Sequence, residues 1–141
     1  ANGDGVAADP AQAFGWFAKS AARGNVKAMH NLAIAYAQGE GTAKDAALAA
    51  EWFLKAAERG YVDSAFDLAV LHERGLGVPQ DLKLALKWYG VAALAADAPS
   101  QERAAFLRQQ VDPAQARAVA DAAVSVLRLS PLVQANRLPD L

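Results

Sequence analysis

The segment AEWFLKAAERG, residues 50–60, decides the fold of this chain because it occurs in three versions at a constant spacing. Residues 14–24 read FGWFAKSAARG and residues 86–96 read LKWYGVAALAA, so each version begins 36 residues after the one before it. The chain has three tryptophans, and they occupy the same place in these versions: Trp16, Trp52 and Trp88. A fixed period of roughly 20–50 residues is the signature of a solenoid built from stacked repeats.

The first helix of each repeat is predicted to start after an aspartate that caps it. The side chain of such an aspartate accepts hydrogen bonds from the free backbone N–H groups of the first turn. The three capping aspartates lie one period apart: Asp9, Asp45 and Asp81. In the second repeat the helix is expected over residues 46–59, with apolar residues at three- and four-residue spacing on one face. These residues are Ala49, Trp52, Phe53 and Ala56.

A second helix, over about residues 62–74 in the same repeat, is predicted to pack against the first. Its inner face would consist of Ala65, Leu68, Ala69 and His72. Gly75 and Gly77 follow it, and glycine is common just past the end of a helix. One such hairpin cannot bury its own apolar stripe, so successive hairpins must stack. We therefore predict an all-α fold, an α-solenoid of stacked antiparallel helix hairpins with 36-residue repeats.

The repeat array is predicted to cover residues 1–111, with a truncated first repeat. After it, Asp112 and Pro113 form a helix start, and the helix they begin is expected to end at residue 128 and to cap the array. The predicted apolar face of this C-terminal capping helix consists of Ala116, Val119, Ala120, Ala123 and Val124. The tail, residues 129–141, contains prolines and leucines without helical spacing, so we expect it to lie extended.

The repeats resemble the Sel1-like repeat family, a relative of the tetratricopeptide repeat, on the evidence of residues 50–60, 68–78 and 81–93. The resemblance implies a module that binds other proteins. A narrower likeness, carried by residues 67–81 and by the segment Lys87-Trp88-Tyr89, is to the periplasmic part of PodJ-type polar localisation factors of alphaproteobacteria. That likeness implies a periplasmic scaffold at the cell pole, within a larger, single-span inner-membrane protein.

The exposed side of the first helices is the candidate partner-binding surface. In a solenoid the first helices line one curved wall, and a concave array offers a groove for a protein or an extended peptide. The candidate residues on this concave face are Gln12, Lys19, Glu51, Leu54, Lys55, Lys87 and Val91. Lys19 and Lys55 lie one period apart, so we expect them to form a ladder along the groove.

Composition narrows the classes of function. Of the 141 residues, 54% are hydrophobic and 21% charged, and the net charge of −1 provides no basic surface for nucleic acid. The absence of cysteine excludes disulfides, thiol catalysis and thiolate metal sites. The start of the chain has neither Met nor a basic signal region, so we expect a piece of a longer protein. Membrane attachment is then expected only through a segment outside this chain.

The chain contains no motif that predicts catalysis, a cofactor or a metal site. His30 aligns with Phe66 of the next repeat, and His72 aligns with Tyr36 of the previous one. We therefore expect both histidines to pack as aromatic side chains rather than to bind a metal, which needs more ligands. The chain is predicted not to be an enzyme. Two alternatives to the polar scaffold stay open: a periplasmic regulator of a sensor kinase, and a peptidoglycan-binding module.

Overall fold

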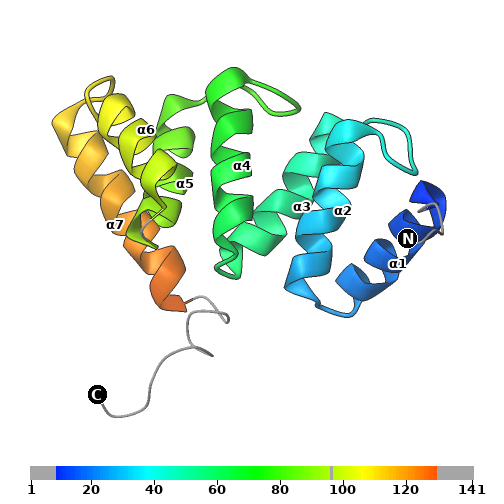
Figure 1. Ribbon diagram of the computed structural model, residues 1–141. Helices are drawn as coiled ribbons and strands as arrows, with labels where there is room; N and C mark the ends of the chain where they lie inside the picture. Colours follow the sequence, from blue (N-terminus) through cyan, green and yellow to red (C-terminus); the bar gives the residue numbers. More distant parts are fainter. Residues whose placement is uncertain (1–8, 96, 130–141) are drawn as a thin grey trace, which may run out of the picture.

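The computed structural model describes residues 9–95 and 97–129, which form a row of seven α-helices without β-strands (Figure 1). The helices are α1 (Pro10–Ala22), α2 (Val26–Gln38), α3 (Ala46–Glu58), α4 (Val62–Arg74), α5 (Leu82–Leu94), α6 (Ala98–Arg108) and α7 (Pro113–Leu129). The second helices of the hairpins, α2, α4 and α6, begin at residues 26, 62 and 98, which are one period apart. The predicted all-α solenoid with 36-residue repeats is confirmed.

Aspartates cap the three first helices, as the sequence predicts. The Asp45 carboxylate accepts a hydrogen bond of 3.0 Å from the Leu48 N–H. Asp9 and Asp81 each accept hydrogen bonds from two N–H groups in the first turn of α1 and α5. Loss of such a cap typically costs about 1 kcal/mol. The caps determine where each first helix begins and therefore which of its side chains face the core.

Among the described residues, the pairs Gly39-x-Gly41 and Gly75-x-Gly77 each place their second glycine against the start of the first helix in the same repeat. Gly41 and Gly77 have φ angles of 75° and 74°, in the left-handed region that favours glycine. A Cβ atom at Gly41 would lie 2.0 Å from the Pro10 carbonyl oxygen, and one at Gly77 would lie 2.4 Å from the Ala46 carbonyl group. Only glycine lets the connection approach the helix start this closely, so these loops close the open ends of the hairpins.

Small residues allow the helices to pack closely. The main core cluster extends from α2 to α7 and includes five of the eight residues predicted for the inner faces of the second repeat: Ala49, Phe53, Ala65, Leu68 and Ala69. A smaller cluster joins α1 and α2 to α3, and its buried members are Ala21, Ala28, Met29, Leu32 and Ala56. Alanine at helix contacts brings the helix axes together, which allows large neighbours to fill the remaining space.

The third repeat ends differently from the first two. Residues 109–112 connect α6 to α7, whereas the two earlier connections between repeats span residues 39–45 and 75–81. α3 packs against α2 and α5 against α4, but α7 packs against α5 and makes few contacts with α6. Ala105 of α6 is therefore exposed, while its counterpart Ala69 is fully buried. The short connection directs α7 away from the place that a fourth first helix would occupy.

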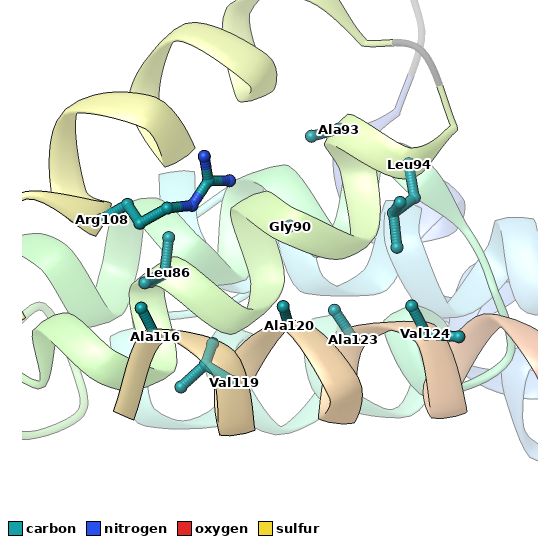
Figure 2. Close-up of a pocket in the computed structure, with 10 residues that line it drawn as sticks. All are labelled: Leu86, Gly90, Ala93, Leu94, Arg108, Ala116, Val119, Ala120, Ala123 and Val124. Carbon is teal, nitrogen blue, oxygen red and sulfur yellow. The ribbon is translucent and has the colours of Figure 1, made fainter. Parts of the chain in front are cut away.

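The helix α7 directs its predicted apolar side toward α5, as Figure 2 shows for Ala116, Val119, Ala120, Ala123 and Val124. The second helix of the third repeat, α6, begins at Ala98, one period after the start of α4. Leu129 still belongs to α7, although the extended tail was expected to begin there. The rest of that tail, residues 130–141, lies outside the described residues.

Candidate functional site

The exposed side of α1 and α3 carries most of the predicted binding residues. Gln12 and Lys19 are exposed on α1, and Glu51, Leu54 and Lys55 are exposed on α3. Within the described part of the chain, Lys19 and Lys55 form no ion pair. Because the two lysines occupy the same place in successive repeats, the array presents two unpaired cations one repeat apart.

The tryptophans next to these lysines become more buried along the array. Trp16 is 67% exposed, Trp52 is half-buried and Trp88 is 2% exposed. Trp52 packs against the core cluster of the preceding hairpin, whereas no hairpin precedes Trp16 among the described residues. The Lys55 Nζ atom lies 4.1 Å from the centroid of the Trp52 ring, a cation–π contact that holds the ammonium group in place. The first repeat therefore combines the exposed Trp16 ring with the exposed Lys19, which pairs with no described residue.

The prediction that Val91 lies exposed on the binding surface is wrong. Val91 is fully buried and belongs to the same core cluster as Ala123 of α7. Lys87 is half-exposed, with its Nζ atom 4.7 Å from the centroid of the Trp88 ring. Val91 is buried because α5 packs against α7 in addition to α4 and α6, whereas α3 packs mainly against α2 and α4. The candidate surface is thus formed mainly by the first two repeats.

A buried histidine marks the opposite side of the hairpins, where the second helices lie. His30 is 8% exposed, and its Nδ1 atom lies 2.7 Å from the Ser64 hydroxyl oxygen. Its ring packs against Phe53 and Tyr61, with centroid distances of 5.6 and 5.0 Å. Burial lowers the pKa of His30, although the negative charge of Asp63 opposes this effect. The predicted aromatic packing role of His30 is confirmed.

The repeat pattern matches a known family over more than half of the chain. The Sel1 repeat matches residues 1–25, 26–61 and 62–97. The chain belongs to the Sel1 repeat family. The two complete Sel1 repeats, residues 26–61 and 62–97, begin at the second helix of a hairpin. They therefore contain α2 with α3 and α4 with α5. Proteins built from Sel1 repeats generally act as scaffolds for protein–protein interaction.

Two solved structures share the Sel1-type fold. One is a protective antigen present in uropathogenic Escherichia coli strains that displays an SLR fold; it is 26% identical, with a TM-score of 0.81 over 96% of this chain and 31% of that chain. The other is a Sel1 repeat protein from Oxalobacter formigenes, 26% identical, with a TM-score of 0.73 over 90% of this chain and 53% of that chain. This chain thus spans about a third and about half of these two proteins. A comparison with curated proteins finds no match.

The Sel1 array also half-buries an acid that the sequence analysis did not single out. Asp67 on α4 lines a pocket together with His30 and Asp63. Burial raises the pKa of Asp67 from 3.8 to about 6, and the negative charge of Asp63 adds to this effect. One signal was available in the sequence, because the residues one period before and after Asp67, Asn31 and Arg103, are also polar.

Replacing Asp67 by asparagine is expected to stabilise the Sel1 array above pH 7 by about 1–2 kcal/mol, since the half-buried carboxyl resists ionisation. The pKa of Asp67 is about 6 in the folded chain, above its ordinary value of 3.8. The protonated carboxyl group therefore contributes stability that is fully present below pH 3.8 and is lost as the pH rises through 6. His30 acts in the opposite direction, because its lowered pKa makes stability fall as the pH drops below 6.5. The measurement is urea unfolding, followed by circular dichroism, between pH 4 and 8.

Asp63→Asn is the matched control, since Asp63 is exposed and acts on Asp67 only through its charge. We expect this control to shift the stability less than Asp67→Asn does. If Asp67→Asn left the pH dependence of the unfolding free energy unchanged, the raised pKa would be wrong.

Further polar groups of the described residues, 9–95 and 97–129, lie outside the pocket that Asp67 lines. Within this part of the chain, no group of three or more histidine, aspartate or glutamate side chains is arranged to hold a metal ion. The Nδ1 atom of His72 is buried and has no hydrogen-bond partner, and burial lowers the pKa of this histidine despite the opposing effect of the Pro79 backbone. None of the helices within residues 9–95 and 97–129 has the length and hydropathy needed to cross a bilayer.

Proposed function

We propose that this chain is a protein–protein interaction scaffold that binds an extended peptide segment along α1 and α3. The observation that carries the proposal is the pair Lys19 and Lys55, both exposed, one repeat apart and without an ion-pair partner among the described residues. Each of them follows a tryptophan by three residues. Carboxylates of the ligand would pair with the two ammonium groups, and its apolar side chains would contact Trp16 and Leu54, which are 67% and 38% exposed.

The charges on this surface favour a ligand with spaced rather than continuous acidic residues. Glu51 lies on α3 one helical turn before Lys55 and is exposed on the same side. A uniformly acidic peptide would meet repulsion at Glu51, whereas carboxylates one repeat apart would face Lys19 and Lys55. Each exposed pair contributes only about 0.2–1 kcal/mol, so affinity must come from contacts spread over both repeats.

At the level of the cell, we propose that the protein acts in the periplasm and recruits partners at a cell pole. Support for this role comes from the likeness of residues 67–81 to PodJ-type polar localisation factors. A scaffold of that kind is expected to have a long coiled coil and one membrane span elsewhere in the full-length protein. A signal peptide shortly before the repeats would instead favour a secreted regulator of a sensor kinase.

The test is a pull-down from a periplasmic extract that contains purified sacculi, with the native chain and a Lys19→Glu, Lys55→Glu variant as baits. The double charge reversal is expected to weaken binding of the partner by about tenfold or more. A Lys27→Glu, Lys83→Glu variant is the matched control, because it changes the net charge equally at two other exposed lysines. Circular dichroism checks that both variants are folded.

Loss of a specific protein from the Lys19→Glu, Lys55→Glu bait alone would support the proposed surface and identify the partner. Equal capture by all three baits would show that the surface of α1 and α3 is not the binding site. Retention on sacculi without a protein partner would make the chain a peptidoglycan-binding module.

A further inference from the structure

A groove opens where α7 diverges from α6. Its floor is α5, with Arg108 of α6 on one side and α7 on the other (Figure 2). The cavity within this groove has a volume of about 180 Å³. It exists because α7 packs against α5 rather than against α6. The groove therefore follows from the short connection at residues 109–112.

The walls of the groove are apolar and partly open to solvent. Leu94 on α5 is 55% exposed and Val124 on α7 is 40% exposed, although both line the groove. Small residues let α5 and α7 approach each other closely beside this groove. A Cβ atom at Gly90 would lie only 3.4 Å from the Ala123 Cβ atom. Small residues bring the two helices together without filling the space beside them, which leaves apolar surface that no described residue covers.

A single cation lies at the edge of this apolar groove. Arg108 is the only charged side chain among the described residues that line it. Its guanidinium group is exposed and forms neither an ion pair nor a hydrogen bond with any described residue. A planar guanidinium group is well suited to bind a carboxylate through two parallel hydrogen bonds. The groove thus presents an apolar cavity next to an unpaired carboxylate-binding group.

We infer that this groove binds the C-terminal residue of a partner protein, with an aliphatic side chain in the cavity and the α-carboxylate on Arg108. A C-terminal leucine or valine carries both groups on one residue, which matches one cation beside one apolar cavity. The volume is smaller than the roughly 300–1,000 Å³ of pockets for drug-sized molecules, so one side chain fits better than a larger ligand. The site lies on the third repeat and does not depend on the proposed surface of α1 and α3.

Fluorescence polarisation with a labelled peptide tests this site on the whole chain. The probe is fluorescein-labelled GSGSVL with a free carboxylate, and its control is the same peptide with a C-terminal amide. The acid is expected to bind about tenfold more tightly than the amide. Arg108→Gln should remove this difference, whereas Arg117→Gln, an exposed arginine outside the groove on α7, should preserve it. Ala120→Leu, which places a larger side chain in the groove, should weaken binding of both peptides.

Methyl chemical shifts of Leu86, Leu94, Val119 and Val124 provide a second readout, and they should move when the acid peptide binds. The inference is overturned if the acid and the amide bind equally, if Arg108→Gln behaves like Arg117→Gln, or if no binding occurs up to about 1 mM. Binding of octanoate but not of the peptide would overturn it as well and would indicate a site for a small acyl ligand. The Lys19→Glu, Lys55→Glu variant should bind the acid peptide normally, so failure of either proposal can be recognised separately.

Discussion

Replacing Trp88 by alanine is expected to lower the free energy of unfolding by about 3–5 kcal/mol, because a large, almost fully buried side chain leaves a cavity. Trp88 is 2% exposed and lies in the main core cluster. The equivalent change at Trp16, which is 67% exposed, should cost less than about 0.5 kcal/mol. Urea unfolding followed by circular dichroism at 222 nm measures all variants without relying on tryptophan fluorescence.

Trp52→Ala provides the intermediate point of this series. Trp52 is half-buried and packs against both core clusters, so its replacement should cost about 2–3 kcal/mol. Equal losses at all three tryptophans would contradict the gradient of burial along the array. A large loss at Trp16 would show that this side chain is covered in solution.

Gly77→Ala is expected to destabilise the fold by more than about 3 kcal/mol, because a left-handed backbone and a steric clash act together. The φ angle of Gly77 is 74°, and the new Cβ atom would lie 2.4 Å from the Ala46 carbonyl group. Backbone atoms at a helix start cannot move aside without disturbing the cap. Thermal and urea unfolding, compared with the native protein, measure the loss.

Gly75→Ala is the matched control for this prediction. Gly75 has a similar φ of 69°, but a Cβ atom there would approach no atom more closely than 3.3 Å. Its replacement should cost only the backbone strain, about 1–2 kcal/mol. If Gly75→Ala and Gly77→Ala destabilised the protein equally, the close approach of the loop to α3 would not exist in solution.

The period of 36 residues predicts the fold well because each helix and turn of the repeat is determined by residues close to it in the sequence. The second helix of the middle repeat, α4, spans Val62–Arg74, as expected from its inner face and the glycine that follows it. The same reasoning misplaced Val91, since it gave this residue the exposure of its counterparts Lys19 and Lys55. Its burial depends on the path of α7, which has no counterpart in the repeat pattern.

Contacts between repeats were also beyond the sequence argument, because only the stacked helices bring the partners together. Glu73 of α4 accepts a hydrogen bond of 2.7 Å from the Tyr89 hydroxyl group and forms an ion pair with Arg103. These three residues lie on α4, α5 and α6. The partial burial of Asp67 and the lack of a described ion-pair partner for Arg108 are likewise properties of the assembled array, so the polar pocket and the groove beside α7 emerged only from the structure.

The short connection at residues 109–112 also bears on how such an array grows during evolution. Gene duplication lengthens a solenoid by whole repeat units, and each new unit needs a loop that returns to its own first helix. A copy inserted before α5 would inherit such a loop, with a glycine equivalent to Gly41 or Gly77. A copy inserted after α6 would lack this loop, and it would meet α7, which already packs on α5. Expansion is therefore favoured on one side of the third repeat, and α7 acts as a terminator of the series.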